Sequence, residues 1–537
     1  MEIKKTIDEL KKFEVFTDPK RSVVYPLHSS LSNEEQAAIF QVPKNGIQKI
    51  VISTNIAETS ITIEDVSYVI DTGKVKENRY DEGNQMPTLV ECYASKAATK
   101  QRRGRAGRVR SGVAFHLYSS YTYSTKLRDY QVPEMLRVGL EDMILQILLL
   151  DLGQPTVFLA KAVDPPSTKA IESSLKLLEN LGAIDVDWKT RKVSAVKTDS
   201  LKTSDLATSS GLTALGFHLA SLPVAPKIGK LLLYGSLFGC CDTALTIAST
   251  LSTRSPFVSP FDKREEADAA RKHFMIESSD PLTIVNAFNS WKRLSTGKKQ
   301  FLAKSFLSSV ALRQLDNMRR QLADALKGIG FLPKHYRLDM SDTDSIQLVK
   351  AILCAGLYPN VIRAPLDLLK KSNSKQVSEV QFQNARGDPV HVHPSSVSFS
   401  TTTLPHRYCV YHDIVKTSKI YVRDLTPVNS FAILLFGGSL KLFHKEGVVT
   451  VDDWIIFRAS AKVAAVLKHL RANMEALLLR KIIMPDEDIE CTGGGRALLA
   501  AILVLFEETE HSRRKMKLDA VTPWSERGSH SIKKKNT

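Results

Sequence analysis

The sequence of 537 residues lacks the features that mark secreted, membrane and zinc-binding proteins. Its six cysteines show no C-x-x-C spacing, so they predict neither a zinc site nor a disulfide framework and favour a reducing environment. The longest apolar run, residues 497–506, is about half of the roughly 18 to 20 residues that a membrane span needs. The N-terminal residues do not form a signal-peptide pattern. We therefore expect a cytoplasmic protein, with the nucleus as the alternative.

The charge balance is strongly basic. Lysine and arginine number 74 against 57 aspartate and glutamate residues, and the net charge is +17. Such a balance is typical of proteins that bind a polyanion, although it does not by itself distinguish nucleic acid from an acidic membrane surface. The length and the 43% hydrophobic content are sufficient for roughly three or four domains of ordinary size.

The most informative segment is residues 101–108, Gln-Arg-Arg-Gly-Arg-Ala-Gly-Arg. If it forms a helix, Gln101, Arg105 and Arg108 lie on one face. Two guanidinium groups and an amide on one face can converge on the oxygens of a triphosphate, and glycine allows the backbone to approach closely. The alternative is a solvated basic run or a localisation signal.

A hydroxyl-rich segment lies about forty residues upstream. Residues 49–53 predict a strand, residues 54–63 read Thr-Asn-Ile-Ala-Glu-Thr-Ser-Ile-Thr-Ile, and residues 68–70 predict a second strand. In an open α/β sheet ligands bind beyond the carboxyl ends of the strands. Thr54, Ser60 and Thr62 would there meet phosphate or ribose, unless these hydroxyls only cap turns.

These two segments resemble motifs V and VI of the DEAH-box/RHA group of ATP-dependent RNA helicases. The patterns of that family, S/A-T-N-I-A-E-T-S-x-T-I and Q-R-x-G-R-A-G-R, are both matched in full and in the right order. Residues 26–31, Pro-Leu-His-Ser-Ser-Leu, resemble motif IVa. The resemblance implies that residues 1–125 are a second RecA-like lobe.

The resemblance also implies a role for individual residues. Three would face the γ-phosphate and act catalytically: Gln101, Arg105 and Arg108. Four would bind ATP, the first by stacking on adenine: Phe40, Ser60, Thr62 and Glu64. Four would hold RNA: Ser29, Ser30, Thr54 and Asn55. Glu64, which would contact the ribose, stands where the family more often has aspartate.

Two motifs of such an enzyme are missing from the sequence. It contains neither a G-x-x-x-x-G-K-[S/T] loop nor a D-E-x-H segment, which hold the phosphates of ATP and its Mg²⁺. Residues 1–10 read as an amphipathic helix with no strand before it. We therefore expect the C-terminal part of a longer helicase, inactive alone, with ATP and Mg²⁺ held mainly by an absent first lobe. The rival interpretation is a non-catalytic RNA-binding or scaffold module.

Two helical regions follow the lobe. Residues 126–200 predict a winged helix, with helices at 140–150 and 171–181 and a hairpin at 183–196. Residues 201–335 are helical, with runs at 244–251 and 281–291, and resemble the helicase-associated ratchet bundle of the same family.

Residues 345–470 predict strands at 388–397, 408–411 and 419–423 and resemble the family's C-terminal OB-like barrel. Arg407, Tyr411 and Arg423 are candidate RNA contacts, although aromatic residues on strands more often fill the barrel. This domain is also where a protein activator would dock. Residues 453–481 and 496–510 predict helices, and residues 471–537 hold C-terminal helices and a basic tail.

The fold class that we expect is therefore an α/β lobe followed by separate α and β domains. The family resemblance implies ATP hydrolysis coupled to 3′-to-5′ translocation on RNA and to its unwinding. No metal site is expected within the chain.

Overall fold

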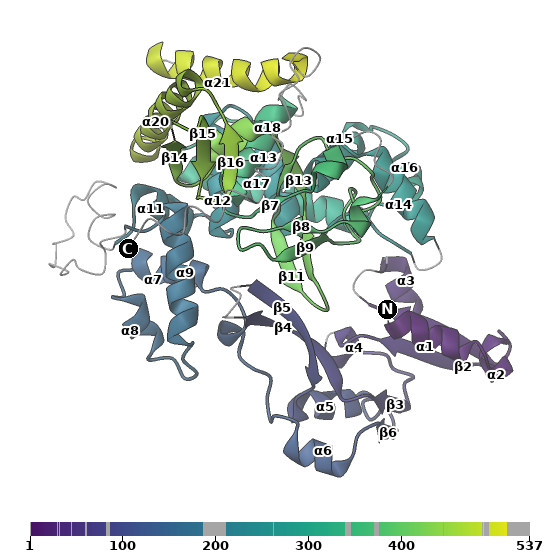
Figure 1. Cartoon of the computed structure of the whole chain (residues 1–537). Helices are drawn as coiled ribbons and strands as arrows, with labels where there is room; N and C mark the ends of the chain where they lie inside the picture. Colours follow the sequence, from purple (N-terminus) through teal and green to yellow (C-terminus); the bar gives the residue numbers. More distant parts are fainter. Residues whose placement is uncertain are drawn as a thin grey trace.

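The computed structural model describes residues 2–28, 31, 33–44, 46–59, 62–81, 86–185, 211–260, 263–338, 345–369, 375–443, 445–485, 487 and 493–512. In Figure 1 the N-terminal lobe lies below a larger block of helices and strands, and helices α20 and α21 lie on the side of that block remote from the lobe.

The lobe alternates helices and strands, which is typical of an α/β fold. Strands β1 (Ser22–Leu27) and β2 (Gln48–Ser53) pair in parallel, as do β3 (Tyr68–Asp71) and β6 (Val113–His116). The strands predicted at residues 49–53 and 68–70 are thus confirmed. The helices of the lobe are α1 (Glu2–Leu10), α2 (Glu14–Thr17), α3 (Asn33–Ala38), α4 (Ile56–Thr59), α5 (Lys96–Arg103) and α6 (Ser120–Thr125).

A long hairpin leaves the lobe and joins the upper block. Its strands, β4 (Lys74–Asp81) and β5 (Met86–Tyr93), are antiparallel, and β5 also pairs in parallel with β11 (Asp413–Lys416). The result is a nine-stranded sheet with the order β13-β10-β7-β8-β9-β12-β11-β5-β4. Figure 1 shows the hairpin rising from the lobe toward β11. The sequence patterns did not predict this connection.

One helix after the lobe, α9, begins and ends where capping residues predict. Helix α9 (Thr168–Leu181) begins after Ser167, whose hydroxyl accepts a hydrogen bond from the amide of Ala170 at 3.1 Å, and ends at Gly182 with a φ of 76°. Its apolar residues Ile171, Leu175, Leu178 and Leu181, which the spacing places on one face, are buried. Most of the predicted hairpin, residues 186–196, lies outside the described residues. The neighbouring elements are η1 (Glu134–Leu136), α7 (Glu141–Leu149) and α8 (Pro155–Leu159).

The described part of the predicted ratchet region, residues 201–335, consists mainly of helices and the segments that connect them. Its longest helix, α17, packs on α13, and Arg319 of α17 forms an ion pair with Asp242 of α13 while only 2% exposed. The helices are α11 (Ala214–Ser221), α12 (Pro226–Leu237), α13 (Cys241–Ser252), α14 (Arg264–His273), α15 (Asp280–Arg293), α16 (Lys298–Lys304) and α17 (Ser309–Gly328). Helix α18 (Ile346–Leu357) follows, within the predicted OB-like region. The largest hydrophobic core runs through α12, α13 and α18.

The β-rich region forms an open sheet, because its strands continue into β5 and β4 of the lobe. The described strands of the predicted OB-like barrel therefore do not close into a barrel. The elements are β7 (Val361–Arg363), η3 (Leu366–Leu369), η4 (Val377–Glu379), β8 (Phe382–Gln383), β9 (Pro389–Val392), β10 (Tyr408–Val410), β12 (Ile420–Arg423), β13 (Thr426–Val428) and α19 (Ser430–Phe436).

The helix predicted at residues 453–481 begins later than expected. Residues 455–458, Ile-Ile-Phe-Arg, form strand β16, because β-branched and aromatic side chains favour a strand and Ile455 is buried against the sheet. Helix α20 (Ala461–Ile483) begins after Ser460, whose hydroxyl accepts from the amide of Val463. The remaining elements are β14 (Leu440–Phe443), β15 (Val448–Val451) and α21 (Gly493–Ser512).

Among the helices of the described chain, none is both long enough and apolar enough to cross a membrane. Within the same ranges, no three His, Cys, Asp or Glu side chains gather as they would to hold a metal ion.

Candidate functional site

The arginine-rich segment is only partly helical. Helix α5 ends at Arg103, and residues 104–110 form successive turns in which the amides of Arg105 and Ala106 donate to the carbonyls of Arg102 and Arg103 at 3.1 Å. The prediction that one helical face carries Gln101, Arg105 and Arg108 is therefore wrong. Glycine at positions 104 and 107 explains the difference, because glycine is a poor helix former.

The three predicted phosphate-facing residues nevertheless lie in one continuous segment. Gln101 is exposed at the end of α5, Arg108 is exposed in the turns and Arg105 is half-buried. Ala106, 2% exposed, anchors the turns. Gly112 allows them to pack closely, since a Cβ atom there would lie 2.3 Å from the Ala106 carbonyl oxygen.

Sequence reasoning missed the residue that holds this segment in place. Arg102 donates from Nε to Glu58 Oε2 at 2.9 Å, and from one terminal nitrogen to Asp71 Oδ1 at 2.8 Å and to the Lys74 carbonyl at 3.2 Å. Burial alone would lower the pKa of Arg102, but its hydrogen bonds to Asp71 and Glu58 outweigh burial and raise the pKa. Arg102 therefore joins α5 to α4 and to the end of β3.

Asp71 is the most buried member of this cluster, with a side chain 1% exposed. Its Oδ1 also accepts from the Gly73 amide at 2.9 Å, and its Oδ2 accepts from the Tyr118 hydroxyl at 3.3 Å. Nδ1 of His116 lies 2.9 Å from the same hydroxyl. Burial, followed by the charge of Asp71, raises the pKa of Tyr118 to about 12. The paired β3 and β6 therefore end in a connected polar cluster.

The hydroxyl-rich segment lies beside this cluster. Strand β2 ends at Ser53, Thr54 and Asn55 follow as exposed residues, and α4 then packs against α5. The Thr54 amide donates to the Leu27 carbonyl at 3.1 Å, which fixes the turn to the end of β1. Two predicted RNA contacts thus lie one helical turn from Glu58.

The other predicted lobe residues fall into two groups. Thr62 is half-buried and Glu64 is exposed, on the segment between α4 and β3. The remaining predicted residues lie outside the described residues: Ser29, Ser30 and Ser60.

Phe40, the predicted adenine-stacking residue, is 52% exposed in the turn after α3. A lysine that the sequence analysis did not single out holds this turn. Lys49 Nζ donates to the carbonyls of Ile39 and Gln41 at 2.8 and 3.0 Å, and it pairs with Asp65 Oδ2 at 2.7 Å while only 6% exposed. Phe40 is therefore fixed beside β2.

The three predicted RNA contacts of the OB-like region differ in accessibility. Tyr411 is 8% exposed and belongs to the core of the sheet, and burial raises its pKa to about 12. Arg407 is half-buried. Arg423, also half-buried, faces His393 Nε2 at 3.3 Å; burial and then this arginine lower the pKa of His393 to about 4. Tyr411 therefore fits the alternative interpretation, in which an aromatic residue on a strand fills the core.

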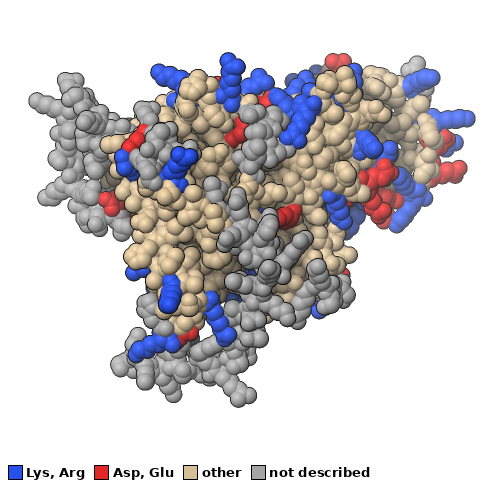
Figure 2. All heavy atoms as spheres, turned by 90° about the horizontal axis from the view of Figure 1, so that it is seen from above, with Lys and Arg blue, Asp and Glu red and all other residues tan. Residues whose placement is uncertain are grey.

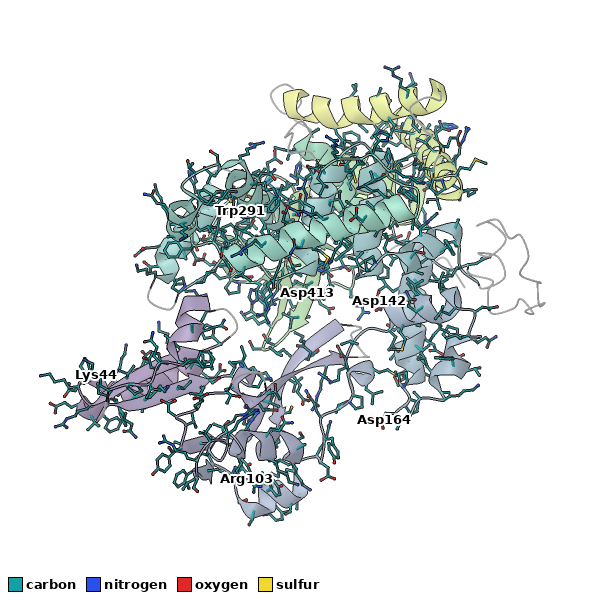
Figure 3. All side chains as sticks on the ribbon, turned by 180° about the vertical axis from the view of Figure 1, so that it is seen from behind. Lys44, Arg103, Asp142, Asp164, Trp291 and Asp413 are labelled. Atoms are coloured by element: carbon teal, nitrogen blue, oxygen red, sulfur yellow. The ribbon has the colours of Figure 1, made fainter. Side chains whose placement is uncertain are left out.

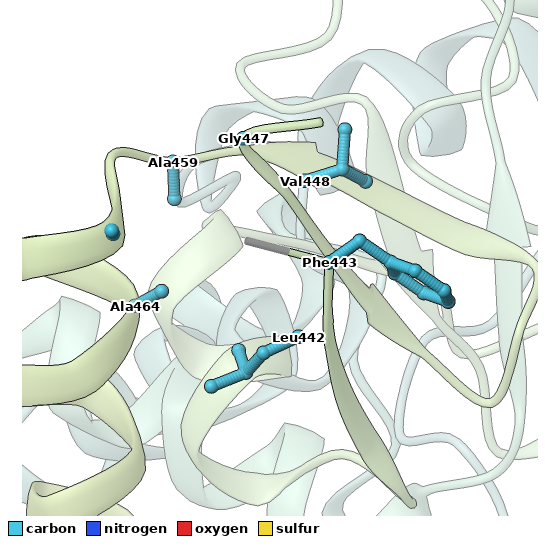
Figure 4. A pocket seen from close by; sticks show the side chains of 7 residues that line it. Leu442, Phe443, Gly447, Val448, Ala459 and Ala464 are labelled. Atoms are coloured by element: carbon cyan, nitrogen blue, oxygen red, sulfur yellow. The ribbon is translucent and has the colours of Figure 1, made fainter. Parts of the chain in front are cut away.

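Two hollows lie on the described residues that follow the lobe. One is a crevice of about 10 Å³ between the β14–β15 hairpin and α20 (Figure 4), which has room for roughly one water molecule. The other is an open groove of about 480 Å³ between the end of α13 and α17. In the view of Figure 2, lysine and arginine side chains lie mainly around the edge of the face.

Comparison with known domain families assigns most of the chain. A helicase conserved C-terminal domain matches residues 2–110, and a ratchet-like helicase-associated domain (HA2) matches residues 225–293. An oligonucleotide/oligosaccharide-binding (OB) fold matches residues 349–440, and a C-terminal domain in RNA helicases matches residues 447–508. This order of domains, together with the arginine segment beside a hydroxyl-rich turn, is typical of the C-terminal part of nucleic-acid helicases.

Individual relatives specify the family. The chain is 40% identical over 517 residues to the ATP-dependent DNA/RNA helicase DHX36 of Bos taurus, covering 94% of this chain and 48% of the relative. It is 39% identical over 481 residues to the ATP-dependent RNA helicase DHX29 of Mus musculus, covering 88% and 33%. It is 37% identical over 522 residues to the DExH-box ATP-dependent RNA helicase DExH1 of Arabidopsis thaliana, covering 95% and 48%.

Over 94% of its length the chain matches DExH-box RNA helicases, and it corresponds to the C-terminal portion of such a helicase. It spans about half the length of the curated relatives DHX36 and DExH1 that it matches, and a third of DHX29.

Proposed function

We propose that this chain serves in an ATP-dependent RNA helicase, in which ATP hydrolysis is coupled to 3′-to-5′ translocation on RNA and to its unwinding. One observation carries the proposal. The exposed Thr54 and Asn55 directly precede α4, and the arginine segment directly follows the neighbouring helix α5, which Arg102 joins to α4.

The lobe would contribute charge to the nucleotide site. Arg105 and Arg108, assisted by Gln101, would neutralise negative charge that develops on the transferred phosphoryl group, an effect worth about 10³ to 10⁵ in rate in related chemistry. Phe40 would stack on the adenine, and Thr62 and Glu64 would contact the sugar or phosphates. Bound ATP with Mg²⁺ supplies the phosphoanhydride that is cleaved.

The residues of this chain fit only one side of such a nucleotide site. The half-buried Arg105 and the exposed Arg108 suit a phosphate, but the sequence lacks both motifs that cradle the phosphates and hold Mg²⁺. We assign these tasks to a first lobe, which the greater length of the relatives can accommodate.

RNA would be the other ligand. The turn at Thr54 and Asn55 would hold backbone phosphates, and Arg407 and Arg423 would extend this contact onto the OB-like region. The net charge of +17 supports a binding affinity that falls steeply with salt. We further propose that a protein activator docks on the OB-like region and that the protein acts in the cytoplasm or nucleus.

A non-catalytic RNA-binding or scaffold role is the second candidate, because the sequence itself contains no phosphate-binding loop. The two functions can be separated by sequencing the transcript upstream of Met1 and by assaying the encoded protein. A helicase requires an in-frame G-K-T and D-E-x-H lobe and RNA-stimulated ATP hydrolysis. A scaffold would bind a single-stranded oligouridylate in a salt-sensitive manner that is indifferent to ATP.

A further inference from the structure

Arg102 lies at the meeting point of the two proposed ligand sites. We propose that Arg102 is a positioning residue which transmits RNA occupancy of the Thr54–Asn55 turn to the arginine segment at residues 104–108. The inference rests on the proposed function, and it specifies how that function is regulated within one lobe.

A continuous series of hydrogen bonds joins the two sites. The Glu58 amide donates to the Asn55 carbonyl at 3.0 Å, and the Glu58 carboxylate accepts from Arg102 Nε at 2.9 Å. The Arg102 carbonyl in turn accepts from the Arg105 amide at 3.1 Å. A shift of Asn55 on RNA binding would therefore reach Arg105 through the side chains of Glu58 and Arg102 and through two backbone hydrogen bonds.

The burial of the ion pair makes this connection stiff. The side chains of Arg102 and Glu58 are 14% and 15% exposed, so bulk water screens their attraction little. The planar guanidinium group also bridges to Asp71, whose own position is fixed by the Gly73 amide and the Tyr118 hydroxyl. Because Asp71 holds one side of Arg102, a movement of Glu58 must reorient the guanidinium group and the end of α5.

The next residue provides a matched control. Arg103 lies on the same helix α5, has the same charge and is exposed, at the lower edge of the lobe in Figure 3. If a nearby positive charge were all that matters, Arg102 and Arg103 would be equivalent. If the hydrogen bonds of Arg102 to Glu58 and Asp71 matter, only replacement of Arg102 should change the response to RNA.

The test is hydrogen exchange of the purified full chain with and without a single-stranded oligouridylate, comparing the native protein with R102Q, R102K, E58Q and R103Q. In the native protein and in R103Q, we expect RNA to slow amide exchange at residues 104–110 by about fivefold or more, the usual lower range for coupled sites. R102Q and E58Q should lose this slowing, and R102K should retain part of it, because lysine keeps the charge without the fork.

A purely structural role would alter exchange equally with and without RNA, so the RNA-dependent difference is the decisive quantity. If R102Q does not fold, as judged by circular dichroism, E58Q and R102K provide the same comparison. Equal RNA responses of R102Q and R103Q, or a full response in E58Q, would overturn the inference and leave RNA binding intact. Failure of the native chain to bind the oligouridylate would instead overturn both the inference and the proposed function.

Discussion

Thr88 of β5 pairs with Lys416 of β11, although 328 positions separate them in the sequence, and this pairing joins the lobe to the OB-like sheet. Strand β5 pairs with β11 on one side and with β4 on the other, so it is an interior strand of the sheet. A proline at position 88 removes an amide donor from an interior strand.

Thr88→Pro should therefore loosen the joint and cost about 1 to 3 kcal/mol in the free energy of unfolding, measured by urea titration. Thr88→Val is the control, because the Thr88 hydroxyl is buried without a hydrogen-bond partner and its loss should be neutral or stabilising. Equal destabilisation by both variants would show that the pairing of β5 with β11 is not what is being measured.

Gly73→Ala should disturb the polar cluster around Asp71. Gly73 has a φ of 69°, and a Cβ atom there would lie 2.5 Å from the Tyr118 ring. Gly46 also has a positive φ, 91°, but open space around its Cβ position. We expect thermal denaturation to show a loss of about 1 to 3 kcal/mol for Gly73→Ala beyond that of Gly46→Ala, which carries backbone strain alone. Similar losses would argue against close packing at Tyr118.

Arg319→Met should be strongly destabilising and Arg320→Met nearly silent. Arg319 is 2% exposed and pairs with Asp242, whereas Arg320 is 61% exposed and pairs with Asp316. Removing one partner of a buried pair leaves the other charge uncompensated and costs about 3 kcal/mol, whereas an exposed pair is worth about 0 to 1 kcal/mol. Urea titration of the two variants checks this prediction, which reversed or equal effects would refute.

Stability should also depend on Asp424. Burial, followed by the nearby charges of Asp280 and Asp413, raises the pKa of Asp424 to about 7. The carboxyl group of Asp424 therefore holds its proton more tightly in the folded chain than in the unfolded chain. The stabilisation is complete below about pH 4 and is lost as the pH rises to about 7.

Asp424→Asn should remove this pH dependence, so that the variant is more stable than the native protein above pH 7. Asparagine also tolerates the left-handed backbone at this position, where φ is 54°. Chemical denaturation at intervals from pH 4 to pH 8 gives the comparison. Parallel stability curves for the two proteins would contradict the assigned shift.

Local patterns predicted the local elements well. The strands β2 and β3 followed from β-branched runs, and α9 followed from its apolar spacing with Ser167 and Gly182 at its ends. In two segments, different local patterns predicted different structures, and the sequence did not show which pattern would prevail. At residues 455–458 the strand preference prevailed over a longer helical pattern, and at Gly104 the glycine ended a helix that the arginine spacing suggested.

Relationships between distant residues could not be predicted in this way. The pairing of β5 with β11 depends on how two domains dock, and Arg102 was passed over because its partners, Glu58 and Asp71, lie 44 and 31 residues away. Its neighbours Gln101, Arg105 and Arg108 were selected because a motif names them. Their roles at a nucleotide remain predictions.

The most direct measurement is the rate of RNA-stimulated ATP hydrolysis by the protein encoded by the full transcript, with Arg105 and Arg108 replaced by alanine and Arg103→Ala as the control. We predict that the double replacement lowers the rate by about 10³-fold or more while Arg103→Ala leaves it nearly unchanged. An undiminished rate in the double variant would contradict the account.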